Sequence, residues 1–515
     1  MRTESLFDSF RAHARRRPDA TALVWRGKRV SYGRLAHWVD RARAVVDTGP
    51  ARTDTRPVCV VAEKSPAAIA VVLACLATGQ SVLAVSPALP RSTLELLSDR
   101  AGCRTVLTPE RIAAAVADRP DDVRVIASPH VVGEEDLTFI LTTSGSTGVP
   151  KLVPLTAGAV DRFTEWAAER FGIRPGTAVL NYAPLNFDLC LLDIWTTLKH
   201  GGQVVLVDPD RATDAGYLLN LFADNDVHVV QAVPLAYRLL LDAAAGGGRS
   251  GGASAGLDRP HHVIVTGDSM PWRDFVALGG LFGAARLYNL YGCTETNDSF
   301  IHEVDTTAPP RSPMPLGTPL PGVDAVVVGS DGMVVEGAGV GELYVSTPFQ
   351  TEGYLGSRRG ESQADFVPDP KGGSSGSRYF RSGDVVRRHA DGSVTLEGRT
   401  DFHVKVAGVR VNTEVVERAI GDHEDVVEVG VVAVPDALAG HRLHAVVRRR
   451  AGTRLNTLVL RRHCAQRLSR DAVPAVIHIV DDPLPRTSTG KVDRKRIGPA
   501  ARFPEGAAEH ESEFV

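Results

Sequence analysis

The sequence predicts an α/β fold with a large N-terminal domain and a small α+β domain after it. Short apolar runs of the kind found in buried strands, Val58–Ala62 and Val82–Val85, alternate with helical patterns. The helical patterns that follow them cover Ala67–Leu76 and Thr93–Asp99. Such alternation is typical of a parallel sheet with helices on both faces. Near residue 400 it gives way to a compact β-rich stretch with two helical patterns.

The alternation continues through the middle of the chain. Apolar runs at Val204–Val207, Val227–Val230 and Val263–Val265 are each followed by helix-like residues. Two Gly- and Ser-rich tracts, Ala243–Gly256 and Lys371–Ser377, cannot form a core and indicate surface loops.

The length allows at least two domains, each with its own core. The chain has 515 residues, of which 43% are hydrophobic and 23% charged, as in ordinary globular proteins. We place the boundary at Thr400–Asp401. This gives a core domain of residues 1–400, a small domain of residues 401–500 and an acidic tail of residues 501–515.

Charge and cysteine content exclude several classes of protein. A formal net charge of -3 argues against a nucleic-acid or membrane-surface binder. The N-terminus lacks the apolar segment of a secretory signal, and no run approaches the roughly 20 apolar residues of a membrane span. The six cysteines are far apart, without a CxxC pair. We therefore expect reduced thiols and a cytoplasmic protein.

A loop rich in small and hydroxyl residues, LTTSGSTGVPK, follows the apolar run Leu137–Leu141. Gly145 and Gly148 allow a close backbone approach to phosphate oxygens, and Lys151 adds a positive charge. The hydroxyl donors are Thr142, Thr143, Ser144, Ser146 and Thr147. Taken alone, the loop is also typical of a flexible linker. It lacks the Gly-Lys-Ser/Thr of the common phosphate loop.

Further polar motifs are spread along the chain. NLYGCTETN contains an aromatic ring that can stack on adenine, and Glu295, an oxygen ligand suited to Mg²⁺. YFRSGD ends in Asp384, EGRTD carries Arg399, and PRTSTGK ends in Lys491. Taken singly, these motifs are also typical of acidic turns, strand ends and solvated basic patches. Activation of a carboxylate with ATP needs such groups together, because it depends on positioning and on neutralising negative charge.

The order of the motifs is more specific than any one of them. TSGSTGVPK, NFDLCLLDIW, NLYGCTET, GELYV, GYLG, YFRSGD, EGRTDFHVKVAGVRVN and PRTSTGKVDRK follow one another between residues 20 and 497. This series resembles the core motifs of amino-acid adenylation domains of the adenylate-forming (ANL) superfamily. It is similar to stand-alone D-alanine and proline carrier-protein ligases. The resemblance implies a large N-terminal domain of mixed sheets and helices, and a small mobile C-terminal lid domain.

The resemblance also implies a reaction and its residues. ATP and Mg²⁺ would convert a small α-amino acid into an aminoacyl adenylate with release of pyrophosphate. The phosphate-binding residues would be Thr143, Ser144, Ser146, Thr147 and Lys151. The other nucleotide positions are Asn289 and Tyr291 at the adenine, Gly267 in the nucleotide site, Thr294 near the phosphate, Glu295 on Mg²⁺, and Asp384 and Arg399 at the ribose. Lys491 would stabilise the adenylation transition state, and Asp401 falls at the hinge. Cys293 and Leu152 depart from the usual proline and glycine, without removing a charged group.

The segment NFDLCLLDIW carries the expected substrate ligand, Asp188. In α-amino-acid-activating members this aspartate pairs with the substrate ammonium; alternatively, Asp188 caps a helix that begins at Leu189. The pocket positions implied by the resemblance are Asp188, Leu189, Leu192, Ala232, Ile264, Thr266, Leu290, Asp298 and Ser299. Most are aliphatic, which favours a small amino acid. Asp298 either recognises a second amine or a hydroxyl, or faces solvent.

The expected acceptor of the aminoacyl group is a phosphopantetheine thiol. The chain ends soon after PRTSTGKVDRK and shows no attachment motif of its own, so we expect a separate acyl or peptidyl carrier protein as partner. Arg494–Arg502 either contributes to that partner surface or is simply solvated. The alternatives are an acyl- or aryl-CoA ligase and a non-catalytic adenylate-binding paralogue. Retention of the charged motif residues argues against the paralogue.

Overall fold

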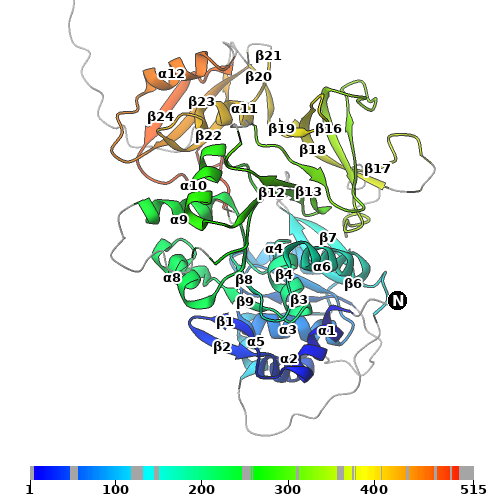
Figure 1. The fold of residues 1–515 in the computed structure, drawn as a ribbon. Helices are drawn as coiled ribbons and strands as arrows, with labels where there is room; N and C mark the ends of the chain where they lie inside the picture. Colours follow the sequence, from blue (N-terminus) through cyan, green and yellow to red (C-terminus); the bar gives the residue numbers. More distant parts are fainter. Residues whose placement is uncertain are drawn as a thin grey trace, which may run out of the picture. The chain divides into compact units, whose positions relative to one another are not determined.

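The structure is a computed structural model of the chain (Figure 1). It describes residues 5–46, 56–117, 132–143, 150–245, 257, 259–308, 313–356, 365–373, 376, 378–406, 409–436, 440–468, 472–487 and 490–497. Most of the Ala243–Gly256 tract, part of Lys371–Ser377 and the tail of residues 501–515 lie outside these ranges. The chain divides into two units. One comprises Met1–Ser382 with Arg388–Thr395, and the other Gly383–Arg387 with Leu396–Val515.

A five-stranded sheet forms the N-terminal part of the first unit. Its order is β5 (Thr105–Leu107), β3 (Val58–Val61), β4 (Val82–Val85), β6 (Leu137–Thr143) and β7 (Lys151–Thr156). The first four strands are parallel, and β7 pairs antiparallel with β6. Strands β3 and β4 are buried along their whole length, as their apolar sequences predict. The associated helices are α1 (Leu6–Arg16), α2 (Tyr32–Val46), α3 (Pro66–Ala77), α4 (Arg91–Arg100) and α5 (Pro109–Val116).

A nine-stranded sheet forms the centre of the first unit. Its order is β14 (Thr318–Pro319), β13 (Asn297–Val304), β12 (Arg286–Cys293), β11 (His262–Thr266), β10 (Val229–Ala232), β8 (Ala178–Asn181), β9 (Gln203–Leu206), β1 (Thr21–Trp25) and β2 (Lys28–Ser31). Neighbours from β12 to β1 are parallel, whereas β2, β13 and β14 pair antiparallel. The predicted α/β fold with mixed sheets is confirmed, although β10 begins two residues later than predicted.

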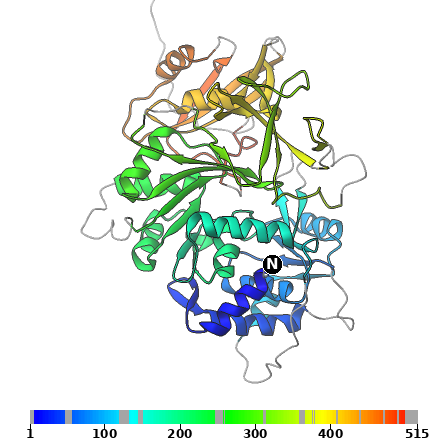
Figure 2. The same cartoon turned by 45° about the vertical axis from the view of Figure 1, so that its right-hand side comes forward.

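Side chains alternate between the two faces of this sheet. Val230 and Val263 pack in one apolar cluster with helices α8 (Ala215–Asn225), α9 (Pro234–Ala245) and α10 (Trp272–Phe282). These three helices lie along one side of the sheet in Figures 1 and 2. Val229 and Ile264 belong to the cluster on the opposite face, with α6 (Ala157–Phe171) and the π-helical segment η1 (Leu191–Thr196). The two-residue period therefore places Gln231 on the face that η1 covers.

Smaller elements complete the first unit. They are α7 (Thr197–Lys199), the 3₁₀ turn η2 (Pro209–Arg211) and a sheet in the order β15 (Asp324–Val328), β16 (Gly339–Ser346), β18 (Arg378–Arg388) and β17 (Phe366–Pro368). The chain passes between the units within β18 and β19 (Val394–Arg399).

The second unit is α+β. It contains the turn η3 (Thr400–Phe402), the pair β20 (His403–Val406) and β21 (Val409–Asn412), and a sheet of β22 (Val426–Asp436), β23 (Gly440–Arg449) and β24 (Val476–Val480). Helices α11 (Thr413–Gly421) and α12 (Thr457–Ala465) pack on that sheet through Val416, Ile420 and Leu460. Asn412 caps α11 by accepting a hydrogen bond from the amide of Glu414, at 2.8 Å.

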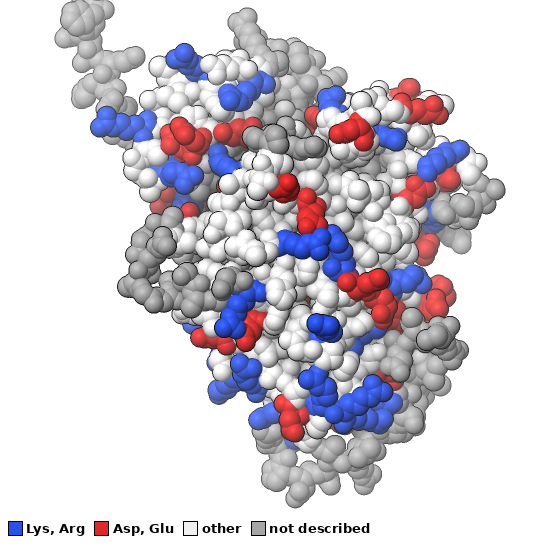
Figure 3. All heavy atoms as spheres, in the orientation of Figure 1, with Lys and Arg blue, Asp and Glu red and all other residues white. Residues whose placement is uncertain are grey.

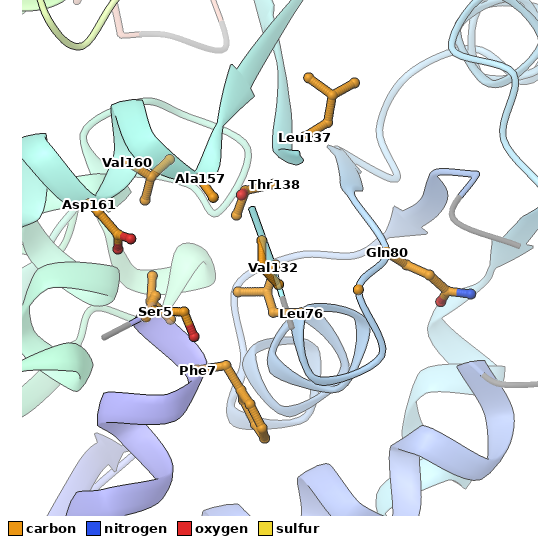
Figure 4. A pocket seen from close by; sticks show the side chains of 12 residues that line it. Ser5, Phe7, Leu76, Gln80, Val132, Leu137, Thr138, Ala157, Val160 and Asp161 are labelled. Atoms are coloured by element: carbon orange, nitrogen blue, oxygen red, sulfur yellow. The ribbon is translucent and has the colours of Figure 1, made fainter. Parts of the chain in front are cut away.

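Two surface features bear on binding. Lysine and arginine side chains are intermingled with aspartate and glutamate on the face shown in Figure 3. A small apolar pocket is lined by residues of α1, α3 and α6, with Asp161 as its ionisable group (Figure 4). Lys199 already pairs with Asp161 at 2.9 Å, and no residue of the expected active site lines the pocket. None of the helices in the described ranges has the length and hydropathy needed to span a bilayer.

Candidate active site

Two residues of the hydroxyl-rich loop lie opposite one another. Thr143 ends β6 and Lys151 begins β7, and the two are paired in the antiparallel register. Ser144, Ser146 and Thr147 lie outside the described residues. The strand pair therefore fixes both ends of the loop that is expected to bind phosphate.

Lys151 is surrounded by groups that hold its ammonium. Its Nζ lies 3.0 Å from Asp365 Oδ2 and 3.4 Å from the hydroxyl of Tyr354. The same nitrogen lies 4.4 Å from the centroid of the Tyr354 ring, a cation–π contact. The lysine is thus oriented before any phosphate arrives.

Tyr354 also connects Lys151 to Glu295. The Tyr354 hydroxyl donates a hydrogen bond of 2.6 Å to Glu295 Oε1. Glu295 is only 8% exposed, and this burial raises the pKa of its carboxyl group, opposed by the Tyr354 hydrogen bond and by Lys151. A cation at Glu295 would relieve the cost of a buried carboxylate.

The expected ammonium ligand lies next to this group. Thr294, which directly precedes Glu295, donates a hydrogen bond of 2.7 Å from Oγ1 to Asp188 Oδ2. Asp188 also contributes to the raised pKa of Glu295 through charge repulsion. The expected ligand of the substrate amine and the expected ligand of Mg²⁺ are therefore close enough to serve one small molecule.

A buried lysine fastens the segment that leads to Asp188. Lys64 Nζ donates to the backbone carbonyls of Asn181, Tyr182 and Ala183 at 3.0, 3.1 and 3.1 Å. Lys64 is 3% exposed, and burial lowers its pKa to about 8. Because Lys64 follows β3, it ties the five-stranded sheet to the end of β8 in the nine-stranded one.

The expected pocket residues fall into two groups. Leu189, Leu192, Ile264 and Leu290 belong to the apolar cluster on the η1 face, and Thr266 lies two residues beyond Ile264 on β11. The side chain of Ala232, by contrast, belongs to the cluster on the opposite face.

Gln231, the neighbour of Ala232 on β10, lies on the η1 face. Its side-chain amide donates to the carbonyl of Leu189 at 3.3 Å. Alternation along β10 accounts for the difference, because adjacent residues of a strand face opposite sides.

The two polar pocket positions on β13 differ in their surroundings. Ser299 is fully buried and bonds to Asn297 O and Thr296 Oγ1 at 3.2 and 3.1 Å. Asp298 pairs in register with Gly292. Burial, together with repulsion by Asp188, raises the pKa of Asp298 well above its usual range.

The expected adenine residues lie on β12. Asn289 donates from its side chain to the carbonyl of Pro315 at 2.9 Å, and the Tyr291 ring packs edge-on against Phe300 with centroids 5.9 Å apart. Gly267 follows β11 with φ of +81°, and a Cβ there would lie 3.2 Å from Val233 Cγ1. Glycine suits this turn because other residues rarely adopt a positive φ.

The remaining expected residues belong to the second unit. Arg399 Nη1 pairs with Asp384 Oδ1 at 2.9 Å, and the side chain of Asn412 donates to the Arg399 carbonyl at 3.2 Å. Lys491 has an exposed side chain, and its carbonyl accepts a hydrogen bond of 2.8 Å from the amide of Thr487.

Several residues of the site escaped sequence reasoning. Tyr354 stands in the GYLG motif, which was noted without a role for its tyrosine. Asp365 and Lys64 lie outside the motifs, so only the three-dimensional structure reveals that they contact Lys151 and the segment before Asp188.

Comparison with known proteins identifies two matching families. Residues 10–355 match the family described as AMP-binding enzyme, and residues 415–491 match the AMP-binding enzyme C-terminal domain. An L-proline–[L-prolyl-carrier protein] ligase of Pseudomonas fluorescens is 30% identical, over 84% of this chain and 86% of that protein. A D-alanine–D-alanyl carrier protein ligase of Bacillus licheniformis is 26% identical, over 96% of this chain and 98% of that protein.

A solved structure shares the fold. NpsA of Klebsiella oxytoca, in complex with 3-hydroxyanthranilyl-AMSN, superposes with a TM-score of 0.80 at 23% sequence identity. The match covers 96% of this chain and 99% of that one.

Proposed function

Because the chain belongs to the AMP-binding enzyme family, we propose that it activates a small α-amino acid as an aminoacyl adenylate and transfers it to a carrier protein. The acceptor would be the phosphopantetheine thiol of that carrier. The observation that carries the proposal is the 2.7 Å hydrogen bond between Thr294 and Asp188, beside Glu295. The relatives named as prolyl- and D-alanyl-carrier protein ligases support the choice of substrate class.

In the first step an oxygen of the amino acid carboxylate attacks the α-phosphorus of ATP, and pyrophosphate leaves. Negative charge builds up on the phosphate oxygens, and a pre-oriented cation stabilises it without reorganisation. Lys151 fits this role because Asp365 and Tyr354 already hold its ammonium. Lys491 and the ribose pair Asp384 and Arg399 are proposed to act in the same step.

Glu295 fits the role of magnesium ligand. Mg²⁺ is commonly held by one or two carboxylates together with substrate phosphates, and bound there it would neutralise phosphate charge. One oxygen of Glu295 accepts from Tyr354, which orients the carboxylate. Within the described ranges no group of three or more His, Cys, Asp or Glu forms a complete protein cage for a metal.

Asp188 would select amino acids over plain acids. An ammonium ion in a small buried pocket needs a negative partner, and Thr294 holds Asp188 in one orientation. Loss of one partner of such a buried pair costs roughly 2–5 kcal/mol.

In the second step the thiol sulfur forms a bond to the carbonyl carbon of the adenylate. The bond from that carbon to the phosphate oxygen breaks, AMP leaves with the electron pair, and the thiol proton passes to solvent. The product is an aminoacyl thioester on the carrier.

A loading assay tests the proposal. The full chain is incubated with ATP, Mg²⁺, an amino acid and a carrier protein bearing phosphopantetheine, and the carrier is weighed by mass spectrometry. We expect a mass increase of one aminoacyl group that hydroxylamine removes. Formation of acyl-CoA from free CoA and an acid without an amino group, with the carrier unmodified, would instead identify an acyl-CoA ligase.

A further inference from the structure

A layer of buried hydrogen-bond acceptors lies on the η1 face of the nine-stranded sheet. Asn181 and Gln231 share a register position on the neighbouring strands β8 and β10, and Asn181 donates to Asp193 Oδ2 of η1 at 3.0 Å. Each of these residues is at most 1% exposed. Asn181 Oδ1, Asp193 Oδ1 and Gln231 Oε1 have no partner among the described residues. Such atoms are normally satisfied by protein or by ordered water, so these three are acceptors that a bound donor would satisfy.

Asp298 adds negative charge to this layer. Its partner across the strand pair is Gly292, where a Cβ would lie 2.7 Å from the Asp298 Cα, so glycine allows the two strands to approach closely. Burial and the charge of Asp188 are the causes that raise the pKa of Asp298. Asp188 repels Asp298, and Asp298 in turn helps to raise the pKa of Asp193. The three carboxylates are therefore within electrostatic reach of one another.

Lys64 does not satisfy these acceptors. An ammonium group has three donors, and those of Lys64 go to the carbonyls of residues 181–183. Asp193 contributes to the pKa of Lys64 only through charge. Among the described residues, the layer thus holds more hydrogen-bond acceptors than donors.

We infer that the amino-acid site beside Asp188 binds a second cationic group, and that the substrate is a small diamino acid. In this arrangement Asp188 pairs with the α-ammonium and Asp298 with the side-chain ammonium. The remaining N–H groups of the side-chain ammonium would face the acceptor layer, in which Asp193 is the residue that interacts electrostatically with Asp298. The inference rests on the proposed function, since it takes Asp188 as the ligand of the α-ammonium.

The apolar residues around the layer limit the length of the substrate. Leu189, Leu192 and Ile264 pack in the cluster on the same face, and Leu192 and Ile264 are fully buried. A substrate with a short side chain fits this surrounding. If ordered water fills the layer instead, a second amine would bring no advantage.

The substrate preference of the full chain tests the inference. Pyrophosphate release is measured with ATP, Mg²⁺ and either 2,3-diaminopropionate or 2-aminobutyrate, which differ by an ammonium in place of a methyl group. A second comparison uses 2,4-diaminobutyrate and norvaline. We expect kcat/KM to be at least about 30-fold higher for the better diamino acid than for its apolar counterpart, as for a buried charge pair.

Substitution of Asp298 tests whether its carboxylate causes the preference for the diamino acid. Asp298→Asn should abolish the preference while the apolar counterpart is still activated. The matched control, Asp305→Asn, removes an exposed carboxylate just beyond the other end of β13 and should keep the preference. A preference that survives in a folded Asp298→Asn variant would overturn the assignment. If that variant fails to fold, as judged by thermal melting, the diamino inference is tested by the substrate preference of the wild-type chain alone.

The assay distinguishes failure of the diamino inference from failure of the proposed function. Equal or better activity with 2-aminobutyrate and norvaline would overturn the diamino inference and leave amino-acid activation intact. Absence of pyrophosphate release with every amino acid would overturn both.

Discussion

The hydroxyl of Tyr354 donates a 2.6 Å hydrogen bond to Glu295 Oε1, although 59 residues separate the two in sequence. The ring of the same tyrosine packs against the ammonium of Lys151. One phenol therefore orients both the expected magnesium ligand and the expected phosphate lysine. This relationship makes Tyr354 a positioning residue for the nucleotide.

Tyr354→Phe should weaken the use of Mg·ATP. The variant keeps the ring but loses a hydrogen bond to a carboxylate, which is worth about 1.5–3 kcal/mol. We expect kcat/KM for ATP to fall by about 10- to 150-fold, and the concentration of Mg²⁺ needed for half-maximal rate to rise. Steady-state pyrophosphate release at varied Mg²⁺ measures both.

A second tyrosine serves as the control. The Tyr217 hydroxyl accepts a hydrogen bond of 3.0 Å from the Asp208 amide. Tyr217→Phe should lower the melting temperature without changing the magnesium dependence. Equal effects of the two substitutions on the magnesium dependence would contradict the role of Tyr354.

Asp188→Asn should impair binding of the amino acid selectively. The change keeps the size of the side chain but removes the charge that faces the substrate ammonium. A loss of roughly 2–5 kcal/mol corresponds to about 30- to several-thousand-fold in kcat/KM for the amino acid. The KM for ATP should change little, and an unchanged specificity constant for the amino acid would refute the pairing.

Lys64→Met should loosen the segment that leads to Asp188. The variant loses three hydrogen bonds to the carbonyls of residues 181–183. We expect a higher KM for the amino acid, a nearly normal KM for ATP and a lower melting temperature. Lys199→Met is the matched control, because Lys199 is equally buried and pairs with Asp161 and Glu165 instead. Lys199→Met should lower the melting temperature without raising the KM for the amino acid. If it raises that KM as much as Lys64→Met does, the KM effect reflects the general loss of a buried lysine and not the position of Lys64.

Lys491→Ala should suppress adenylate formation while ATP still binds. The account assigns Lys491 to the transition state, so amino-acid-dependent exchange of pyrophosphate into ATP should fall by orders of magnitude. Lys495→Ala removes another exposed lysine from the same segment and should retain exchange. Near-normal exchange by Lys491→Ala would exclude this role.

The sequence predicted the strands of the sheets better than the details of the site. Val58–Ala62 and Val82–Val85 are apolar throughout because both faces of these strands are buried, and the structure contains strands at both places. The predicted helix at Ala67–Leu76 corresponds to α3, whose residues are buried except for the half-buried Ala67. Local periodicity carries such information because burial acts on every residue of an element.

The site depends on contacts between distant segments, which periodicity does not encode. Lys64 and the carbonyls that it binds are more than a hundred residues apart. The resemblance implied Ala232 as a pocket position, and the structure adds that its neighbour Gln231 faces η1 while Ala232 packs on the other face. For Asp298 the sequence left recognition of a substrate group and exposure to solvent open. In the structure Asp298 is half-buried and burial raises its pKa, so recognition of a substrate group stays a prediction.

The most direct test of amino-acid activation is the release of AMP and pyrophosphate by the full chain. ATP, Mg²⁺ and single amino acids of both configurations, including diamino acids, are supplied, with the matching acids that lack the α-amino group as controls. The account predicts release with at least one small amino acid and none above background with its desamino counterpart. Release that is equal with both, or absent with every amino acid, would contradict it.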